Sequence, residues 1–190
     1  RKNFQSVVDS LEYLKKLGVN AIQLMPVIEF EGNDSWGYNP TFFMASDKKY
    51  GPADDLKAMI DACHAEGIAV ILDIVPNHAF GRNPYVQLYW DAGLQRPAWN
   101  SPYFNAVATH PFSVGYDFNH ESGYVRTMFH RIFKHWIDEF NIDGYRIDLS
   151  KGLTQTNSGN DIGAWTNYDQ SRVDIIFDYA NTIWSYDPDF

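Results

Sequence analysis

The stretch ACHAEGIAVILDIVPNH, residues 62–78, contains the transition that decides the fold. A predicted helix ends at Gly67, a residue type that commonly follows helix C-termini. The apolar run IAVILDIV comes next and is typical of a strand buried on both faces. The chain then becomes polar at once, in the sequence PNH. This order of helix, glycine, buried strand and polar strand end indicates one repeat of a parallel α/β fold.

The same alternation occurs on both sides of this stretch. Hydrophobic periodicity predicts helices over residues 4–17, 53–66, 124–140 and about 168–184, and strands over 19–25, 68–75 and 142–148, with a loop-rich segment at 26–52. Strands that alternate with helices form right-handed βαβ units and a parallel sheet. The carboxyl edge of such a sheet is where α/β folds assemble their sites, and polar residues follow the predicted strands. We therefore expect a functional site at that edge.

The composition fits a folded, acidic protein. Hydrophobic residues make up 45% of the 190 residues, which is enough for a sizeable core, and the formal charge of -9 disfavours nucleic-acid and anionic-membrane partners. No apolar run approaches the roughly 20 residues that a membrane helix needs. The single cysteine, Cys63, excludes an internal disulfide and is expected to be a small buried residue on a helix. The sequence indicates no cellular compartment.

Residues 79–122 form a long connection that is rich in aromatic residues and proline. Its length exceeds that of a usual βα connection, which predicts either a small inserted subdomain or a loop that covers a substrate. Its aromatic side chains are expected mainly to pack on one another. They are Tyr85, Tyr89, Trp90, Trp99, Tyr103, Phe104 and Phe112.

The third predicted strand ends with two charged residues. Arg146 and Asp148 lie two residues apart and so share one face of the strand, which would be the inner face of a barrel. A carboxylate beside a permanent guanidinium charge stays ionised, which suits a nucleophile or a stabiliser of positive charge better than a proton donor. Taken alone, an Arg-x-Asp sequence is more often a structural ion pair.

Polar and aromatic residues follow the other strands. Asp73, Asn77 and His78 end the second strand, and an imidazole beside an amide can donate to and accept from sugar hydroxyls. Trp36 and Tyr38 lie in the loop WGYNP, where either ring could stack on a sugar. Each of these residues alone is more often part of an ordinary turn. The chain has no zinc-ligand spacing, no nucleotide-binding glycine loop and no G-x-S-x-G sequence.

Four motifs in a fixed order carry a family resemblance: WGYNP at 36–40, YGPADDLKAMIDACHAEGIAVILDIVPNH at 50–78, DFN at 117–119 and DGYRIDLSK at 143–151. Together they resemble the α-amylase family of retaining glycoside hydrolases and transglycosylases. The resemblance covers the whole chain and implies strands two to four of a (β/α)8 TIM barrel, which typically needs about 250 residues. Residues 1–190 would then be a partial catalytic domain, with 79–122 as a short domain B. The rest of the barrel is expected in the same longer chain, called the parent protein below.

The resemblance also implies catalytic roles. Asp148 matches the nucleophile that forms a covalent glycosyl-enzyme, Arg146 would keep it ionised and aimed, and Asp73 would help orient the arginine. The family's acid/base glutamate closes the fifth strand, and no glutamate follows Asp148 in this chain. We therefore expect this polypeptide alone to be inactive. The alternative is a catalytically silent, carbohydrate-binding relative.

The other matched residues are implied to bind substrate. Tyr38 would stack under the sugar whose bond is broken, and Trp36 is the second candidate stacking ring. His78 would bind a sugar hydroxyl, and Lys151 would contact the leaving-group side. Asn77 would hold the domain B loop and, in some members, a structural calcium ion, with no cofactor otherwise required. The expected partner is an α-linked glucan or oligosaccharide.

One position departs from the family pattern. Gly152 stands where α-amylases usually have histidine, and the form WGYNP is also similar to branching and debranching members. We therefore expect an enzyme that acts on starch, glycogen or maltooligosaccharides, without choosing among them. Hydrolysis and transfer, and α-1,4 and α-1,6 bonds, all stay open.

Overall fold

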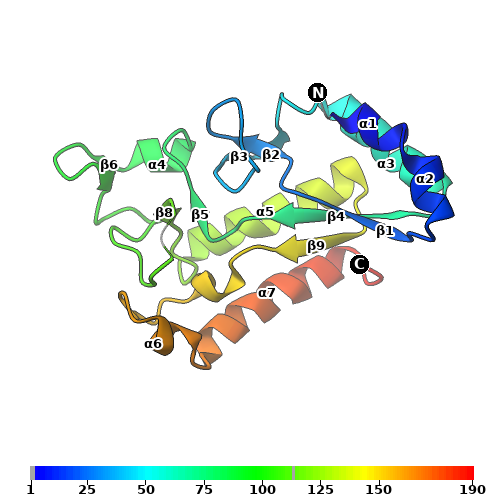
Figure 1. Ribbon diagram of the computed structural model, residues 1–190. Coiled ribbons are helices and arrows are strands. Elements are labelled where there is room, and N and C mark those ends of the chain that lie inside the picture. The colour runs from blue at the N-terminus through cyan, green and yellow to red at the C-terminus, as the bar shows by residue number, and fades with distance from the viewer. Residues whose placement is uncertain (1–2, 113) are drawn as a thin grey trace.

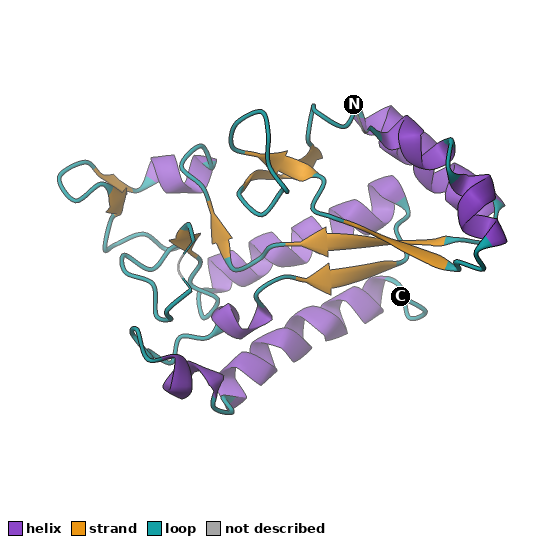
Figure 2. Ribbon diagram, viewed as in Figure 1, coloured by secondary structure: helices purple, strands orange, loops and turns teal. Residues whose placement is uncertain are grey.

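The computed structural model describes residues 3–112 and 114–190. Its centre is a parallel three-stranded sheet in the order β1–β4–β9, made of Ala21–Leu24, Ala69–Ile74 and Gly144–Ile147. The long helices are α3 (Ala53–Ala65), α5 (Gly123–Phe140) and α7 (Gln170–Tyr186). Helices α5 and α7 run alongside β4 and β9, and the helices alternate with the sheet strands along the chain (Figures 1 and 2). The predicted parallel α/β fold is confirmed.

The shorter elements complete the chain. The remaining helices are α1 (Phe4–Val8), α2 (Leu11–Lys16), α4 (Pro84–Leu88), the 3-10 helix η1 (Ser150–Leu153) and α6 (Ile162–Thr166). The remaining strands are β2 (Ile28–Phe30), β3 (Pro40–Ser46), β5 (His78–Ala79), β6 (Trp90–Asp91), β7 (Arg96–Pro97) and β8 (Tyr116–Asp117). The predicted helix over 4–17 is therefore two helices. The Ser10 hydroxyl bonds to the Ser6 carbonyl at 2.8 Å, the kind of local bond that competes with a continuous helix.

The two faces of the sheet have different surroundings. Val70, Leu72 and Ile74 of β4 are almost completely buried, in one core with side chains of α3, α5 and α7. Successive strand residues point to opposite faces, so Asp73 lies on the other face. Arg146 of β9 is exposed on that face. In a closed barrel this face would be the interior.

Residues 26–52 contain a structure that the sequence did not indicate. Strands β2 and β3 pair as an antiparallel hairpin with irregular register. The fully buried carboxylate of Asp47 accepts hydrogen bonds from the backbone N–H of Phe30 at 3.2 Å and of Lys49 at 2.8 Å. The segment is loop-rich as expected, but the sequence did not indicate these two strands, because the turn-forming residues of EGNDSWGYNP outweigh the short apolar runs beside them.

The insert at 79–122 folds back on the carboxyl edge of the sheet (Figure 1). It is closed by the antiparallel pairing of β5 with β8, in which His78 lies opposite Asp117. Ring contacts join Tyr85 to Tyr103, Tyr89 to Tyr103, Trp90 to Tyr116, and Phe104 to Phe118. These contacts agree with the expectation that the aromatic residues pack on one another. Trp99 and Phe112 are exceptions, because 86% of Trp99 is exposed and the Phe112 ring contacts Trp165, which lies outside the insert.

The expectation for the single cysteine agrees with the described structure. Cys63 is buried in the core on α3. Within residues 3–112 and 114–190, no helix combines the length and hydrophobicity needed to span a bilayer.

Candidate active site

Strand register brings charged residues together at the carboxyl edge of the sheet. Asp73 of β4 lies directly opposite Arg146 of β9 in the parallel pairing. One guanidinium nitrogen of Arg146 donates to both carboxylate oxygens of Asp73, at 3.0 and 2.9 Å, and to Asp148 Oδ1 at 2.5 Å. A single arginine therefore joins two carboxylates in one network, which we call the Arg146 network.

Burial differs sharply across the Arg146 network. The Asp73 side chain is fully buried, whereas 22% of the Asp148 side chain is exposed. Burial raises the pKa of Asp73, and hydrogen bonds from Arg146 and Tyr38 oppose this rise. Desolvation lowers the pKa of Arg146, but its hydrogen bonds to both carboxylates outweigh that effect and raise it. Asp73 thus anchors a charged arginine, and Asp148 is the carboxylate that an external molecule can reach.

The loop WGYNP places Tyr38 in this network. Gly37 has a φ of +94°, and a Cβ there would lie 2.2 Å from the Pro26 carbonyl oxygen, so only glycine fits. The Tyr38 hydroxyl donates to Asp73 Oδ2 at 2.9 Å. Burial and this bond to a carboxylate raise the pKa of Tyr38, which keeps the hydroxyl protonated as a donor.

The sequence PNH adds a buried imidazole and a buried amide. His78 Nε2–H donates to the Tyr38 carbonyl at 2.9 Å, which leaves Nδ1 to accept from Asn77 Nδ2–H at 3.1 Å. Burial lowers the pKa of His78, so its ring is held in the neutral form. Both ring nitrogens are occupied, and the predicted sugar contact would require one of these bonds to be exchanged.

Two predicted substrate-binding residues lie apart from the network. Trp36 is 77% exposed in the loop before β3. Lys151, in η1, has its Nζ 5.3 Å from the centre of the Trp165 ring. Their roles in binding substrate stay predictions.

His120 is a structural residue that sequence reasoning missed. Its Nε2–H donates to the Pro76 carbonyl at 2.7 Å, and its Nδ1 accepts from the Tyr179 hydroxyl at 2.6 Å. These bonds join the end of the insert to the loop after β4 and to α7. Burial lowers the pKa of His120 to about 4. It directly follows the DFN motif, but a single histidine has no spacing pattern that could have marked it.

The calcium expectation depends on the surroundings of Asn77. Its Oδ1 is buried and has no hydrogen-bond partner among the described residues. The carboxylate of Asp117 already accepts from His110 Nε2 at 3.2 Å, Asn105 Nδ2 at 2.8 Å and Thr109 N at 3.5 Å. Calcium takes about six to eight oxygen ligands, and the described residues contain no group of three His, Cys, Asp or Glu side chains that could hold a metal. Asn77 Oδ1 by itself does not make a calcium site, and the possible structural calcium ion stays a prediction.

The packing around Asn77 explains why residue 152 is a glycine. A Cβ at this position would lie 1.8 Å from Asn77 Oδ1 and 2.9 Å from His110 Nε2. Any side chain would therefore collide with the buried Asn77. The glycine that departs from the usual α-amylase pattern is required by the packing of these two residues.

Comparisons with known proteins show the family of this chain. The family described as "Alpha amylase, catalytic domain" matches residues 3–104, more than half of the chain. The malto-oligosyltrehalose trehalohydrolase of Saccharolobus solfataricus is 30% identical over 185 residues, which are 97% of this chain and 28% of that protein. The 1,4-alpha-glucan branching enzyme of Halothermothrix orenii is 31% identical over 184 residues, which are 94% of this chain and 28% of that protein.

A solved structure shares the fold. Eubacterium rectale Amy13B superposes with a TM-score of 0.80 at 24% sequence identity, over 98% of this chain and 38% of that chain. The parallel βα repeats, with a charged network at the carboxyl ends of the strands, define a segment of a (β/α)8 barrel. The chain belongs to the α-amylase family. It spans 28% of the length of each of the two relatives above and is a partial segment of the catalytic barrel.

Proposed function

We propose that this chain is part of a retaining enzyme that acts on α-glucans, as a hydrolase or a transglycosylase, with Asp148 as the nucleophile. The observation that carries the proposal is the Arg146 network, in which a buried Asp73 fixes the arginine that holds Asp148. The names of the two relatives, which refer to malto-oligosyltrehalose and to 1,4-alpha-glucan, support the substrate class.

In the proposed reaction, an oxygen of Asp148 attacks the anomeric carbon while the glycosidic C–O bond breaks, which forms an aspartyl glycosyl ester. A carboxylic acid elsewhere in the parent protein protonates the departing oxygen. As a carboxylate it then takes a proton from water, or from a sugar hydroxyl in the case of transfer, and the resulting oxygen nucleophile cleaves the ester. Asp148 is released unchanged.

The surrounding residues would position the sugar. Tyr38 presents a ring whose hydroxyl is fixed by Asp73, so this ring is a preorganised stacking surface. His78 is neutral and can exchange its bond to the Tyr38 carbonyl for a bond to a sugar hydroxyl. We further propose that the enzyme needs no calcium at Asn77, because the Asp117 carboxylate is already hydrogen-bonded.

The nucleophile can be tested by trapping. The parent protein would be incubated with a fluorinated glucosyl fluoride, which slows cleavage of the ester, and then digested for mass spectrometry. We expect the adduct on the peptide that contains Asp148, and Asp148→Asn should show neither adduct nor turnover of maltooligosaccharides. Asp143→Asn is the control, because that carboxylate lies before β9 and bonds to His64 and the Val70 N–H. An adduct on another residue, or glucan binding without turnover by the wild type, would contradict the proposal.

A further inference from the structure

The His120 ring joins helix α7 to the turn that follows β4. Its Nε2 lies 2.7 Å from the Pro76 carbonyl oxygen, and its Nδ1 lies 2.6 Å from the Tyr179 hydroxyl. A carbonyl oxygen can only accept a hydrogen bond, so Nε2 must carry the proton of the neutral ring. Nδ1 is then an acceptor, and the Tyr179 hydroxyl must donate to it. The Tyr179 hydroxyl therefore selects the tautomer in which His120 holds the Pro76 carbonyl.

His78 repeats this arrangement at the other end of the turn. Its Nε2–H donates to the Tyr38 carbonyl at 2.9 Å, and its Nδ1 accepts from Asn77 Nδ2–H at 3.1 Å. Asn77 directly follows Pro76, so the peptide group that contains the Pro76 carbonyl also sets the position of Asn77. The Asn77 carbonyl accepts from the Phe118 N–H at 3.0 Å. The orientation of the His78 ring therefore depends on how this peptide group is held.

These bonds form one series, which ends beside the proposed nucleophile. We call it the Tyr179 network, and it consists of Tyr179, His120, the Pro76–Asn77 peptide group with the Asn77 side chain, and His78. Tyr38, whose carbonyl accepts from His78, donates its hydroxyl to Asp73 in the Arg146 network. A residue in the middle of α7 is thus joined by hydrogen bonds to the carboxyl edge of the sheet.

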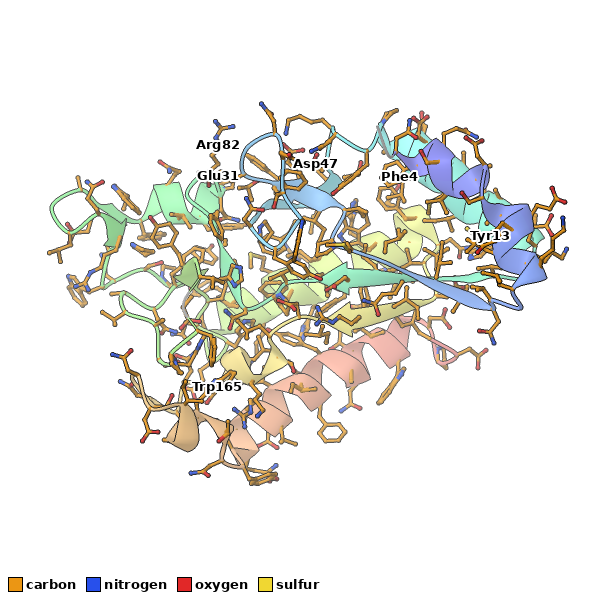
Figure 3. The ribbon with its side chains drawn as sticks, viewed as in Figure 1. Phe4, Tyr13, Glu31, Asp47, Arg82 and Trp165 are labelled. Carbon is orange, nitrogen blue, oxygen red and sulfur yellow. The ribbon has the colours of Figure 1, made fainter. Side chains whose placement is uncertain are left out.

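Helix α7 is a fixed support for Tyr179. At the start of the helix, the buried guanidinium of Arg172 donates to three backbone carbonyls, those of Lys151, Trp165 and Asn167, at 3.1, 3.3 and 2.9 Å. Figure 3 shows Trp165 at the end of the molecule where α7 begins. The Tyr179 ring is fully buried in the core, and burial raises its pKa. Its hydroxyl therefore stays protonated as a donor.

We propose that Tyr179 and His120 are positioning residues, which fix the His78 ring so that it can bind a sugar hydroxyl next to Asp148. The proposal rests on the α-glucan function proposed above. Both residues are fully buried, so neither touches the substrate. Without the Tyr179 hydroxyl, His120 could carry its proton on Nδ1, and the Nε2 lone pair would then repel the Pro76 carbonyl. The turn would shift, and His78 would shift with it.

The test compares two tyrosines of the parent protein that each lose a hydroxyl. Tyr179→Phe should lower kcat/KM for maltooligosaccharides about three- to tenfold, because a displaced His78 holds the sugar less well. Tyr145→Phe is the matched control. Its hydroxyl donates to the Phe133 carbonyl at 2.8 Å in the same core, and its loss should leave kcat/KM unchanged.

Two substitutions of His120 give an independent comparison. In His120→Gln, the amide can still donate to the Pro76 carbonyl and accept from Tyr179, so this variant should keep most of the wild-type kcat/KM. His120→Leu can make neither bond and should lose at least as much as Tyr179→Phe. Equal kcat/KM in these two variants would overturn the proposal.

A double-mutant cycle separates positioning from a general loss of stability. In a His78→Ala background, Tyr179→Phe has no imidazole left to displace, so its effect on kcat/KM should nearly disappear. An equal loss in both backgrounds, or no loss in the background with His78, would overturn the proposal.

Nitrogen-15 NMR of the histidine-labelled parent protein gives a readout that does not depend on activity. In the wild type, His120 and His78 should both be protonated at Nε2, and their signals are assigned by their loss in His120→Gln and His78→Ala. This measurement tests the network even if Tyr179→Phe does not fold, because a wild-type His120 protonated at Nδ1 would overturn it. Correct tautomers without any turnover by the wild type would instead overturn the proposed function on which the proposal rests.

Discussion

Acid should destabilise the protein through His120. This imidazole is fully buried, and burial lowers its pKa from an ordinary value of 6.5 to about 4. The folded protein therefore binds this proton more weakly than the unfolded chain does. The contribution of His120 to stability is fully present above about pH 6.5 and is lost as the pH falls toward 4.

The size of the effect follows from the same two values. At about 1.4 kcal/mol per pH unit, the gap between 6.5 and about 4 amounts to about 3 kcal/mol of unfolding free energy. That is a large fraction of the about 5–15 kcal/mol that holds a typical protein folded. His120→Gln should remove this part of the pH dependence, because its neutral amide can both donate to Pro76 and accept from Tyr179.

The assay is urea unfolding of the parent protein at four pH values between 4.5 and 7.5, followed by circular dichroism. The wild type should lose stability across this range, and His120→Gln should lose about 2–3 kcal/mol less, because pH 4.5 lies just above the folded-state pKa. His130→Gln is the control, because His130 is partly exposed beside Asp178. If the wild type and His120→Gln lose the same amount of stability between pH 7.5 and 4.5, the argument from burial is refuted.

Three other predictions concern packing, metal and activity. Gly152→Ala should lower the free energy of unfolding by about 1–3 kcal/mol, because the new Cβ collides with Asn77, whereas Gly123→Ala, at the exposed start of α5, meets no neighbouring atom and serves as the control. A fall of the melting temperature by less than 1 °C in the Gly152 variant would contradict this collision. Treatment of the parent protein with EDTA should leave its melting temperature and glucan turnover unchanged. A loss of stability or turnover that calcium restores would contradict the proposal that no calcium is needed at Asn77. Purified 1–190 should show no turnover of maltooligosaccharides, since retaining cleavage needs a second carboxyl group as acid/base and no glutamate follows Asp148 in this chain. Turnover that Asp148→Ala abolishes would show the opposite.

The main elements of the fold could be predicted because their signals are local. Apolar runs such as IAVILDIV, stopped by glycine and followed by polar residues, indicate buried parallel strands whatever their partners. The β2–β3 hairpin could not be predicted, since β2 has only 3 residues and is held partly by the buried carboxylate of Asp47, which accepts a hydrogen bond from the Phe30 N–H, 17 positions earlier in the sequence. Long-range bonds of this kind leave no periodic pattern.

For the candidate site too, the sequence indicates some of the residues and not others. Arg146 and Asp148 could be singled out because their spacing places them on one strand face, and Asp73 because it ends the neighbouring strand. Their contact depends on register, which pairs Asp73 with Arg146 and which the sequence does not state. His110, His120 and Trp165 were missed, because a lone histidine or tryptophan has no spacing pattern, and their contacts with Asp117, Tyr179 and Lys151 are set by the fold.

The charges in the Arg146 network favour different roles for its two carboxylates. Asp73 and Asp148 carry two formal negative charges against the single positive charge of Arg146, so the network has a formal charge of -1. Excess negative charge at the mouth of the sheet is suited to the positive charge that develops on a sugar as its glycosidic bond breaks. Asp73 is fully buried and receives hydrogen bonds from both Arg146 and Tyr38, whereas Asp148 receives one from Arg146 and is partly exposed. The carboxylate with spare lone pairs and an open approach is the one that can attack, so Asp73→Asn should loosen the arginine and lower kcat, while Asp148→Asn should abolish turnover outright.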